Sequence, residues 1–426
     1  MISVACLPAD LGDIPGTDVR FDLYSHSRIG DRGRVGNRVP GPLQKLGLRP
    51  PAIAWDFTTF ALAAVAADET APRDRSPDGW TREIALTIAV TDPDLWNGQA
   101  AVLTTALRFL SGDIWHINFV GHGIAPTGRG RERLRPENLV CLLSGGMDSL
   151  VGAIDVVREG HQPLLVSQIA KGDSADQRWF AQTIAPSSLH LQLNHHARPP
   201  GRSERSQRAR SLAFLGFGVL AASCTTAYRD GIEVELRIPE NGFISQNVPL
   251  TPMRTGSLST KTTHPYFLAL MQDALRSAGL HVRLNNPYAV ATKGEMLSAC
   301  QDQQMLAKLA SASTSCGRFS RTGFQHCGRC VPCQVRRGAY MAWGRADDTV
   351  KGYKYDDLGI GDARHGRFDD VRSVALAIEN VRRNGLAELI GGSINTQLLG
   401  NAAPYKDVVR RGISELAALH AAYGVP

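Results

Sequence analysis

The alternation of apolar and polar positions along the chain changes near residue 138. Before that point, segments such as 19–25 and 81–90 alternate apolar with polar or β-branched residues, as strands do. After it, short and continuously apolar runs alternate with segments of helical spacing. Continuously apolar runs are typical of strands that are buried on both faces of a parallel sheet. The pattern therefore predicts a βαβα order and a doubly wound α/β sheet after residue 138.

The same pattern gives residue ranges for the expected elements. In the doubly wound part we expect strands at 138–143, 163–168, 189–193 and 232–238, and helices at 148–159, 174–184 and 204–228. In the first part we expect strands at 19–25, 81–90 and 115–120, a strand followed by a helix within 52–66, and a helix at 95–112. After residue 345 we expect mostly helix, most clearly at 369–385.

These changes divide the chain into segments of different character. We expect an N-terminal α+β accessory domain at 1–123, a linker at 124–137, an α/β domain at 138–310, a cysteine-containing segment at 311–345 and a helical C-terminal extension at 346–426. The linker contains glycine, proline and four arginines without apolar periodicity, which is typical of a solvated connection. An alternative stays open, in which these arginines contact the phosphates of RNA or DNA.

Composition and charge narrow the class of protein. Hydrophobic residues make up 43% of the chain and charged residues 20%, which is typical of a soluble globular protein. The sequence has no run of about 18 apolar residues and no signal-like start, so we expect a cytoplasmic protein without a membrane span. The formal net charge of +7 would suit a polyanionic partner, but it is modest for 426 residues. Nucleic acid is therefore the less favoured partner.

The segment VCLLSGGMDSLVGAIDVV places a Ser-Gly-Gly-x-Asp-Ser turn between an expected strand and an expected helix. Two glycines allow several backbone N–H groups to point into one concavity in front of the helix N-terminus, which suits a phosphate. A carboxylate repels phosphate, so Asp148 makes sense if it holds Mg²⁺ or caps the helix. The alternative is a plain glycine turn. The expected phosphate-binding residues are Leu143, Ser144, Gly145, Gly146, Met147, Asp148 and Ser149.

The residues LLSGGMDS resemble the pyrophosphatase loop of the PP-loop ATPases, a family with a doubly wound, HUP-like fold. The resemblance implies a PP-loop ATP-pyrophosphatase domain at 138–310, which cleaves ATP between its α and β phosphates. It implies that a carboxylate oxygen attacks the α-phosphate and that an amine or a sulfide then displaces AMP. ATP and Mg²⁺ are therefore the expected cofactors of this loop, and Asp148 and Ser149 the expected catalytic residues.

A second motif is formed by four cysteines at the spacing Cys-x10-Cys-x2-Cys-x2-Cys. In a reducing compartment this spacing favours a metal site over disulfides, and four thiolates suit a closed, structural zinc site. An iron–sulfur cluster and unliganded redox cysteines are the alternatives. The expected zinc ligands are Cys316, Cys327, Cys330 and Cys333.

The two motifs together resemble the 7-cyano-7-deazaguanine synthase (QueC) branch of the PP-loop family. In that branch a Ser-Cys pair precedes a Cys-Gly-x-Cys-x-x-Cys run and a basic helix, as in CGRCVPCQVRRGAYMAWG here. The segment ATKGEM resembles the Thr-Lys-x-Glu segment of this branch, which implies that Thr292, Lys293 and Glu295 lie near the nucleotide or the substrate. Lys293 suits a phosphate or a carboxylate.

The chain departs from the short members of this branch in three places. It lacks their Gly-Arg-Asn segment, so Arg208 or Arg210 is expected to take over the role of that arginine, and it lacks their Asp-Cys-Arg segment. The segment 239–267 and the N-terminal domain resemble longer QueC-like proteins of anti-phage defence operons, the QatC type. This resemblance gives further candidates for contacts with the base or the acceptor: Glu240, Asn241, Ser259, Thr260, Lys261, Thr263 and His264.

The expected function is an AMP-forming ligase that adenylates 7-carboxy-7-deazaguanine and joins it to an amine. The amine is expected to be ammonia or the N-terminus of a partner protein from the same operon, because an added domain suits a protein acceptor better than ammonia alone. Two other functions compete with this one. A tRNA sulfurtransferase would share the loop but would need a free cysteine near ATP, and a non-catalytic scaffold would only bind nucleotide.

Overall fold

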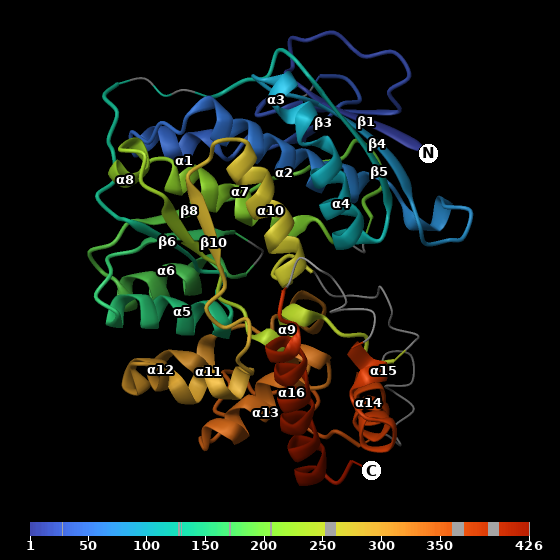
Figure 1. Ribbon diagram of the computed structural model, residues 1–426, viewed down its shortest axis with the longest axis vertical. Coiled ribbons are helices and arrows are strands. Elements are labelled where there is room, and N and C mark those ends of the chain that lie inside the picture. The colour runs from blue at the N-terminus through green and yellow to red at the C-terminus, as the bar shows by residue number, and fades with distance from the viewer. Residues whose placement is uncertain are drawn as a thin grey trace.

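The computed structural model describes residues 1–425 except 28, 127, 129, 170–171, 205–206, 252–260, 360–369 and 391–399. Its architecture is α/β and contains two five-stranded sheets, in the orders β3-β2-β1-β4-β5 and β10-β9-β6-β7-β8. Every pair of neighbouring strands in both sheets is parallel. Figure 1 shows the sheets one above the other, with helices between them and a helical C-terminal part below.

The first unit comprises the N-terminal sheet and its helices. Its strands are β1 (Ile2–Leu7), β2 (Val19–Leu23), β3 (Gly33–Val35), β4 (Glu83–Ala89) and β5 (Ile114–Val120). Its helices are α1 (Pro40–Lys45), α2 (Ala52–Thr70), α3 (Pro93–Gly98) and α4 (Ala100–Ser111), with a 3-10 turn at Arg73–Arg75. The apolar side chains of β4 alternate with polar ones, so one face of this sheet packs on the helices.

The second unit carries the Ser-Gly-Gly-x-Asp-Ser loop. Its strands are β6 (Leu139–Leu142), β7 (Leu164–Gln168), β8 (His190–Leu193), β9 (Val234–Arg237) and β10 (Val282–Asn285). Its helices are α5 (Met147–Arg158), α6 (Ser174–Ile184), α7 (Arg210–Ala222), α8 (Thr226–Arg229), α9 (Gly242–Gln246) and α10 (Pro265–Ser277). The strand order reverses beside β6, and such a switch point in a doubly wound sheet is where ligands bind.

The C-terminal part of the chain is helical. It contains α11 (Lys293–Ala299), α12 (Gln303–Leu309), 3-10 turns at Ala310–Ala312 and Phe319–Thr322, α13 (Val331–Trp343), α14 (Asp370–Asn384), α15 (Ala387–Ile390) and α16 (Ala403–Ala422). One apolar cluster joins α5, α6, α11, α12 and α13 on one face of the second sheet. Another joins α9, α13, α14 and α16. Helix α16 therefore packs against the elements that surround the loop (Figure 1).

The two sheets share one continuous hydrophobic core, which runs through helices α2 and α7. Every residue from Ala54 to Thr70 of α2 is buried. A Cβ atom on Gly216 of α7 would lie 3.3 Å from the Ala61 side chain, and the Thr58 hydroxyl donates a hydrogen bond to the Gly216 carbonyl (3.2 Å). Small residues at this crossing let the two helices approach closely. The first unit is therefore packed firmly on the second.

Most elements expected from the sequence are present within one or two residues of their predicted ends. The strands expected at 81–90, 115–120, 138–143, 163–168 and 189–193 correspond to β4 to β8, and the helices expected at 148–159 and 174–184 to α5 and α6. The C-terminal helix expected at 369–385 corresponds to α14. The described residues of the linker at 124–137 form no helix and only one isolated β-bridge.

The N-terminal unit differs from the expectation in two respects. Its sheet is entirely parallel, so the unit is α/β and not α+β. Residues 52–66 are helical throughout, where a strand followed by a helix was expected. A helix that is covered on all sides has no polar face, so its apolar run resembles that of a buried strand.

Two predicted helices have bounds other than those expected. The helix expected at 204–228 begins only at Arg210, since the Asp68 carboxylate accepts the N–H groups of Arg208 and Ala209. It ends at Ala222, and Thr225 then caps the short α8. The helix expected at 95–112 is divided into α3 and α4. Within the described residues, no helix combines the length and the apolarity that a membrane span requires.

The half-buried imidazole of His190 predicts a pH dependence of stability. Its Nε2 lies 2.8 Å from the Ser167 hydroxyl, and burial, followed by the Arg178 charge, lowers the pKa of His190 to about 4 from 6.5. As the pH falls from 6.5 toward 4, the unfolded chain takes up this proton before the folded chain does, so stability is lost. Urea unfolding of the His190→Asn variant should therefore show a smaller decrease in stability between these pH values than wild type. Equal decreases would contradict the assignment.

Candidate functional site

The Ser-Gly-Gly-x-Asp-Ser loop joins the end of β6 to the start of α5 and is held closed by its two serines. The hydroxyl oxygens of Ser144 and Ser149 lie 2.9 Å apart, the Ser149 hydroxyl accepts the Ser144 N–H (3.0 Å), and the Ser144 hydroxyl accepts the Gly146 N–H (3.1 Å). Gly145 has a φ of +88°, a conformation that side chains other than glycine rarely adopt. The loop is therefore a preformed turn in front of a helix N-terminus, the geometry that suits an anion.

The two apolar residues of the motif anchor this turn. The Leu143 N–H donates to the Val166 carbonyl on β7 (2.7 Å), which extends the β6 ladder by one residue. The Met147 side chain is fully buried in the cluster beneath α5. Leu143 thus attaches the start of the loop to the sheet, and Met147 attaches the start of α5 to the apolar cluster.

Asp148 lies at the centre of a buried polar cluster. One oxygen of its carboxylate pairs with the Lys293 ammonium, and the other accepts the Asn241 side-chain amide (2.7 Å) and the Asn241 backbone N–H (3.2 Å). Burial alone would raise the pKa of Asp148, but the Lys293 charge and these hydrogen bonds hold that pKa below its usual range. Asp148 is therefore a permanently charged carboxylate beside the loop.

A second carboxyl group, that of Glu240, adjoins Asp148. It accepts a hydrogen bond from the Asn241 side chain (3.2 Å). Burial, followed by the negative charge of Asp148, raises the pKa of Glu240 well above its usual value. The structure thus brings together four of the residues expected at the site, Asp148, Glu240, Asn241 and Lys293, from three separate parts of the sequence.

Lys293 is the first residue of α11, and its position is fixed by a capping box. The Thr292 hydroxyl accepts the Glu295 N–H (3.1 Å), while the Glu295 carboxylate accepts the Thr292 N–H (2.9 Å). Thr292 and Glu295, both predicted to lie near the nucleotide or the substrate, hold the start of α11 in this structure. They orient the lysine that pairs with Asp148.

Helix α16 holds the same region from its other side. Arg411 forms an ion pair with Glu295 (2.6 Å) and donates to the Val290 carbonyl (2.7 Å), and Glu415 accepts hydrogen bonds from the Thr292 hydroxyl and the Gly294 N–H. Gly412 packs so closely on α9 that a Cβ there would lie 2.3 Å from the Phe243 ring. Helix α16 therefore braces both α11, which carries Lys293, and α9, which follows Asn241. No sequence pattern predicted these contacts of α16.

The contacts of Arg411 predict a measurable contribution to stability. We expect Arg411→Ala to lower the free energy of unfolding by about 1 kcal/mol, because it removes partly exposed ion pairs with Glu295 and Asp407 and a hydrogen bond to the backbone. Among the described residues, the neighbouring Arg410 pairs only with Asp407 on the same helix, and it is more exposed, so Arg410→Ala should cost less than about 0.5 kcal/mol. Equal losses in urea unfolding would argue against the bracing contact.

The other candidates lie at the junction of the two units. The Arg208 side chain donates to the Ser111 carbonyl (3.2 Å) and lies over the Trp80 ring (4.9 Å), so it contacts the first unit. The Lys261 ammonium lies over the Phe109 ring (4.5 Å). The buried His264 caps α10 by accepting the Tyr266 N–H (3.1 Å) and lies close to the same phenylalanine. Thr263 immediately precedes His264, and Ser259 and Thr260 lie outside the described residues.

Arg210 lies nearer to the loop. It begins α7, and its carbonyl accepts a hydrogen bond from the Gln168 side chain at the end of β7 (3.4 Å). Burial raises the pKa of Asp173 above its usual value, and the Arg210 charge opposes this shift. Gln177, which the sequence did not single out, donates to the Ser144 carbonyl (3.0 Å). The ends of β6 and β7 thus lie beside one another at the loop.

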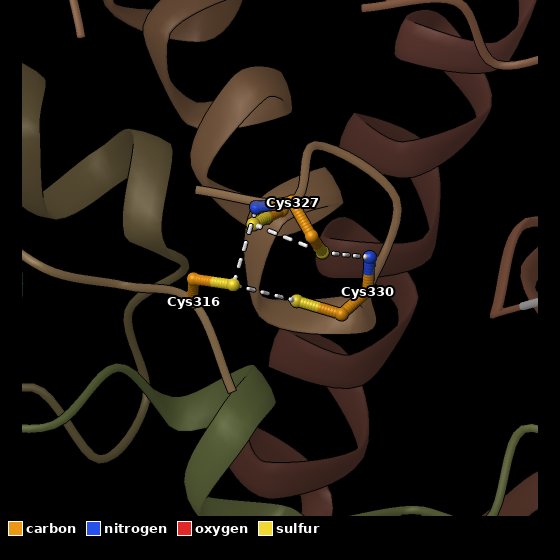
Figure 2. A group of neighbouring side chains, drawn as sticks. Cys316, Cys327 and Cys330 are labelled. Carbon is orange, nitrogen blue, oxygen red and sulfur yellow. Dashed lines mark hydrogen bonds between the residues drawn. The ribbon is translucent and has the colours of Figure 1, made fainter. Parts of the chain in front are cut away.

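The four cysteines of the second motif form one compact, buried cluster. Their sulfur atoms all lie within 4.8 Å of one another, and two of the pairs are separated by 3.9 Å. Sulfurs about 2.3 Å from a central zinc ion would be about 3.8 Å apart in a tetrahedron, so the cluster can hold a metal such as zinc. Figure 2 shows the sulfurs of Cys316, Cys327 and Cys330 directed toward one another. The predicted ligand set is confirmed as a possible metal site.

The cysteine cluster is connected directly to the loop. The Thr314 N–H, two residues before Cys316, donates to the Gly145 carbonyl (2.9 Å). The fully buried Arg336 of α13 donates to the Ser313 carbonyl (3.0 Å) and to the Ala310 carbonyl (2.9 Å). These two hydrogen bonds hold the segment that connects α12 to the cysteine cluster. A metal in this cluster would therefore stabilise the segment that supports the loop.

A cavity of about 740 Å³ opens between the segment before α7 and the cysteine segment. It is lined by Ser203, Glu204, Gln207 and Arg321. Its volume lies within the range of small-molecule sites, and polar side chains line it.

No protein-family model matches the chain, and no curated protein matches it.

Proposed function

We propose that the chain is an AMP-forming ATP pyrophosphatase that activates the carboxylate of 7-carboxy-7-deazaguanine and joins it to an amine. The observation that carries the ATP chemistry is the closed loop from Ser144 to Ser149, beside a charged Asp148–Lys293 pair. A glycine-containing turn at a helix N-terminus favours a polyphosphate, and the absence of a Walker lysine disfavours γ-phosphate hydrolysis. The acid itself is inferred from the sequence resemblance to the 7-cyano-7-deazaguanine synthases.

In the proposed first step, a carboxylate oxygen bonds to the α-phosphorus while the bond to the bridging α–β oxygen breaks. The electron pair of that bond leaves with pyrophosphate, and the acid becomes an acyl-adenylate. The loop amides and the two serine hydroxyls bind the departing pyrophosphate, where negative charge develops. Lys293 offers a positive charge next to the same loop. In the second step the amine bonds to the acyl carbon, loses a proton, and AMP leaves.

The chain offers a donor set for Mg²⁺ at this place. Asp148 and Glu240 are adjacent carboxyl groups, and burial, followed by the negative charge of Asp148, raises the pKa of Glu240. These two side chains would hold the ion, which would neutralise charge on the separating phosphates. Zinc is the proposed metal of the cysteine cluster, with a structural role, because a closed set of four thiolates leaves no position for a substrate.

The proposal is tested by incubating the purified chain with ATP and 7-carboxy-7-deazaguanine. AMP, pyrophosphate and a new mass on the base are expected only when both substrates are present with an amine such as ammonia. If the products include ADP in place of AMP, the proposal fails. A protein acceptor is tested separately by intact mass spectrometry of a partner co-expressed with wild-type or Asp148→Ala enzyme. An unmodified partner in both samples would leave ammonia as the acceptor.

A further inference from the structure

Seven cationic side chains lie around the short helix α1. They come from the first unit, the linker and the segment after β8, and we call them the basic face: Arg34, Arg38, Lys45, Arg49, Arg131, Arg133 and Arg198. Within the described part of the chain, none of the seven forms an ion pair. The neighbouring Arg135 and Arg229, in contrast, pair with Glu137 and Glu132. Ion pairs therefore do not explain why these seven arginine and lysine side chains lie close together.

One half of the basic face converges on His196. The backbones of Arg34 and Arg198 pair with each other through two hydrogen bonds (3.0 and 2.8 Å), which join the edge strand β3 to the segment after β8. His196 has a φ of +45° and is held by the Asn37 side chain (2.6 Å). Burial lowers the pKa of His196, and the charges of Arg38, Arg198 and Arg34 lower it further. The Arg198 guanidinium donates to the His196 Nε2 (3.3 Å), and the charges of Arg38 and Arg34 act on the same ring.

The other half lies at the far end of α1. Lys45 is the last residue of α1, and the Arg49 side chain donates to the Gly130 carbonyl of the linker. The Arg133 N–H donates to the Gly47 carbonyl (2.8 Å), and a Cβ on Gly47 would touch the Arg133 side chain at 3.1 Å. These contacts hold the linker against the turn after α1. Since α1 has six residues, it separates the two halves by only about 9 Å.

The spacing and the chemistry of these groups decide which partner they fit. A single phosphate or a mononucleotide would occupy one half, whereas two cationic groups about 9 Å apart fit a chain of phosphates. Guanidinium groups bind phosphate oxygens through paired N–H donors. The seven side chains of the face are cationic, and cationic groups contact the phosphates of a nucleic acid, whereas stacking on bases requires aromatic rings. Most of its members, including Arg38, Arg131, Arg133 and Arg198, are exposed.

We propose that the basic face binds the sugar–phosphate backbone of a nucleic acid without reading its sequence. Because Arg34 and Arg38 come from the first unit and Arg198 from the second, the surface is complete only where the two units join. The segment that carries Arg198 begins at β8 and touches the end of β7 through His195, whose Nδ1 lies 2.9 Å from the Gln168 side chain. A bound nucleic acid would therefore lie near the loop edge of the second sheet. This proposal does not depend on the proposed ATP chemistry, because it uses none of the residues of the loop.

Fluorescence anisotropy with a labelled duplex DNA of mixed sequence tests the proposal. The test variant is Arg38→Gln/Arg133→Gln/Arg198→Gln in the full chain. The matched control is Arg382→Gln/Arg383→Gln/Arg410→Gln, which removes the same charge from exposed arginines paired within α14 and α16. Thermal unfolding verifies that both proteins are folded, and titrations between about 50 and 200 mM salt give the number of phosphate contacts.

Wild type should bind the duplex with an affinity that falls steeply with salt. The test variant should bind at least about tenfold more weakly, and its slope against the logarithm of salt should be smaller by about 0.9 for each lost contact. The control should stay close to wild type. Absence of binding by wild type at low salt, or equal losses in the test variant and the control, would overturn the proposal. So would binding to anionic phosphatidylserine vesicles without binding to the duplex.

Discussion

Replacing Asp148 with asparagine should lower the rate of AMP formation by about a thousandfold, the size of effect seen when a charge-stabilising group is removed from an active site. The carboxylate is buried, permanently charged, and placed between the loop and Lys293. Asparagine keeps the shape and the hydrogen bonds to Asn241 in part, but it removes the charge. The rate is measured by following pyrophosphate release from ATP in the presence of the acid.

Two further variants separate chemistry from folding. Asp148→Asn leaves Lys293 buried without its partner, which is costly. The double variant Asp148→Asn/Lys293→Met removes both charges, should be folded, and should be equally inactive. The control is Asp155→Asn on the same helix. Asp155 is also buried and accepts the Tyr288 hydroxyl (2.5 Å) and the Gln301 N–H (2.9 Å), so this variant should lose about 1–3 kcal/mol of stability and remain active when folded. Full activity in Asp148→Asn would contradict the assignment.

Replacing Cys333 with serine should cause the largest loss of stability. Its side chain is completely buried in the cluster of four cysteines, and a serine hydroxyl is a poor zinc ligand at neutral pH. Because structural zinc contributes on the order of 10 kcal/mol to the folding of small domains, we expect the segment from Ser313 to α13 to unfold locally. Zinc content by mass spectrometry should fall from about one ion per chain to near zero, and the melting temperature should drop by roughly 10 °C or more.

The matched control for this variant is Cys300→Ala. Cys300 is buried in the apolar cluster under α5, outside the four-cysteine group. The Cys300→Ala variant should retain zinc, and its free energy of unfolding should fall only by the cost of a small cavity, about 1 kcal/mol. If Cys333→Ser kept its metal and its melting temperature, the cluster would not be a structural metal site. If both variants lost metal, the loss would reflect unfolding in general.

The second sheet was predictable because its strands have short apolar runs and clear turns between them. The alternation of strand and helix after residue 138 implied parallel strands, and the structure contains them. Strands β1, β3 and β10 were not predicted; β3 has only three residues, and β10 has a single fully buried residue and so lacks a continuous apolar run. The N-terminal unit was assigned to the wrong class because its central strand β1, which pairs with β2 and β4, was missed, and α2 was interpreted as a strand followed by a helix.

The candidate site was predictable only where one short motif contains all its members. The loop and the cysteines each follow a compact spacing, so their residues could be named from the sequence. The cluster around Asp148 draws Asn241 and Lys293 from elements about a hundred residues away or more, and resemblance suggested those residues while chemistry alone did not. The bracing by Arg411 and Glu415 depends on the tertiary packing of α16, which leaves no local pattern.

The transfer of oxygen from the acid to AMP tests the central claim most directly. If a carboxylate oxygen attacks the α-phosphate, 7-carboxy-7-deazaguanine labelled with oxygen-18 in its carboxyl group must pass one labelled atom to the AMP that is released. The enzyme, ATP, labelled acid and ammonia are incubated together, and the AMP is analysed by mass spectrometry. We predict AMP that carries one heavy oxygen, together with unlabelled pyrophosphate. Unlabelled AMP, or the formation of ADP, would contradict the account.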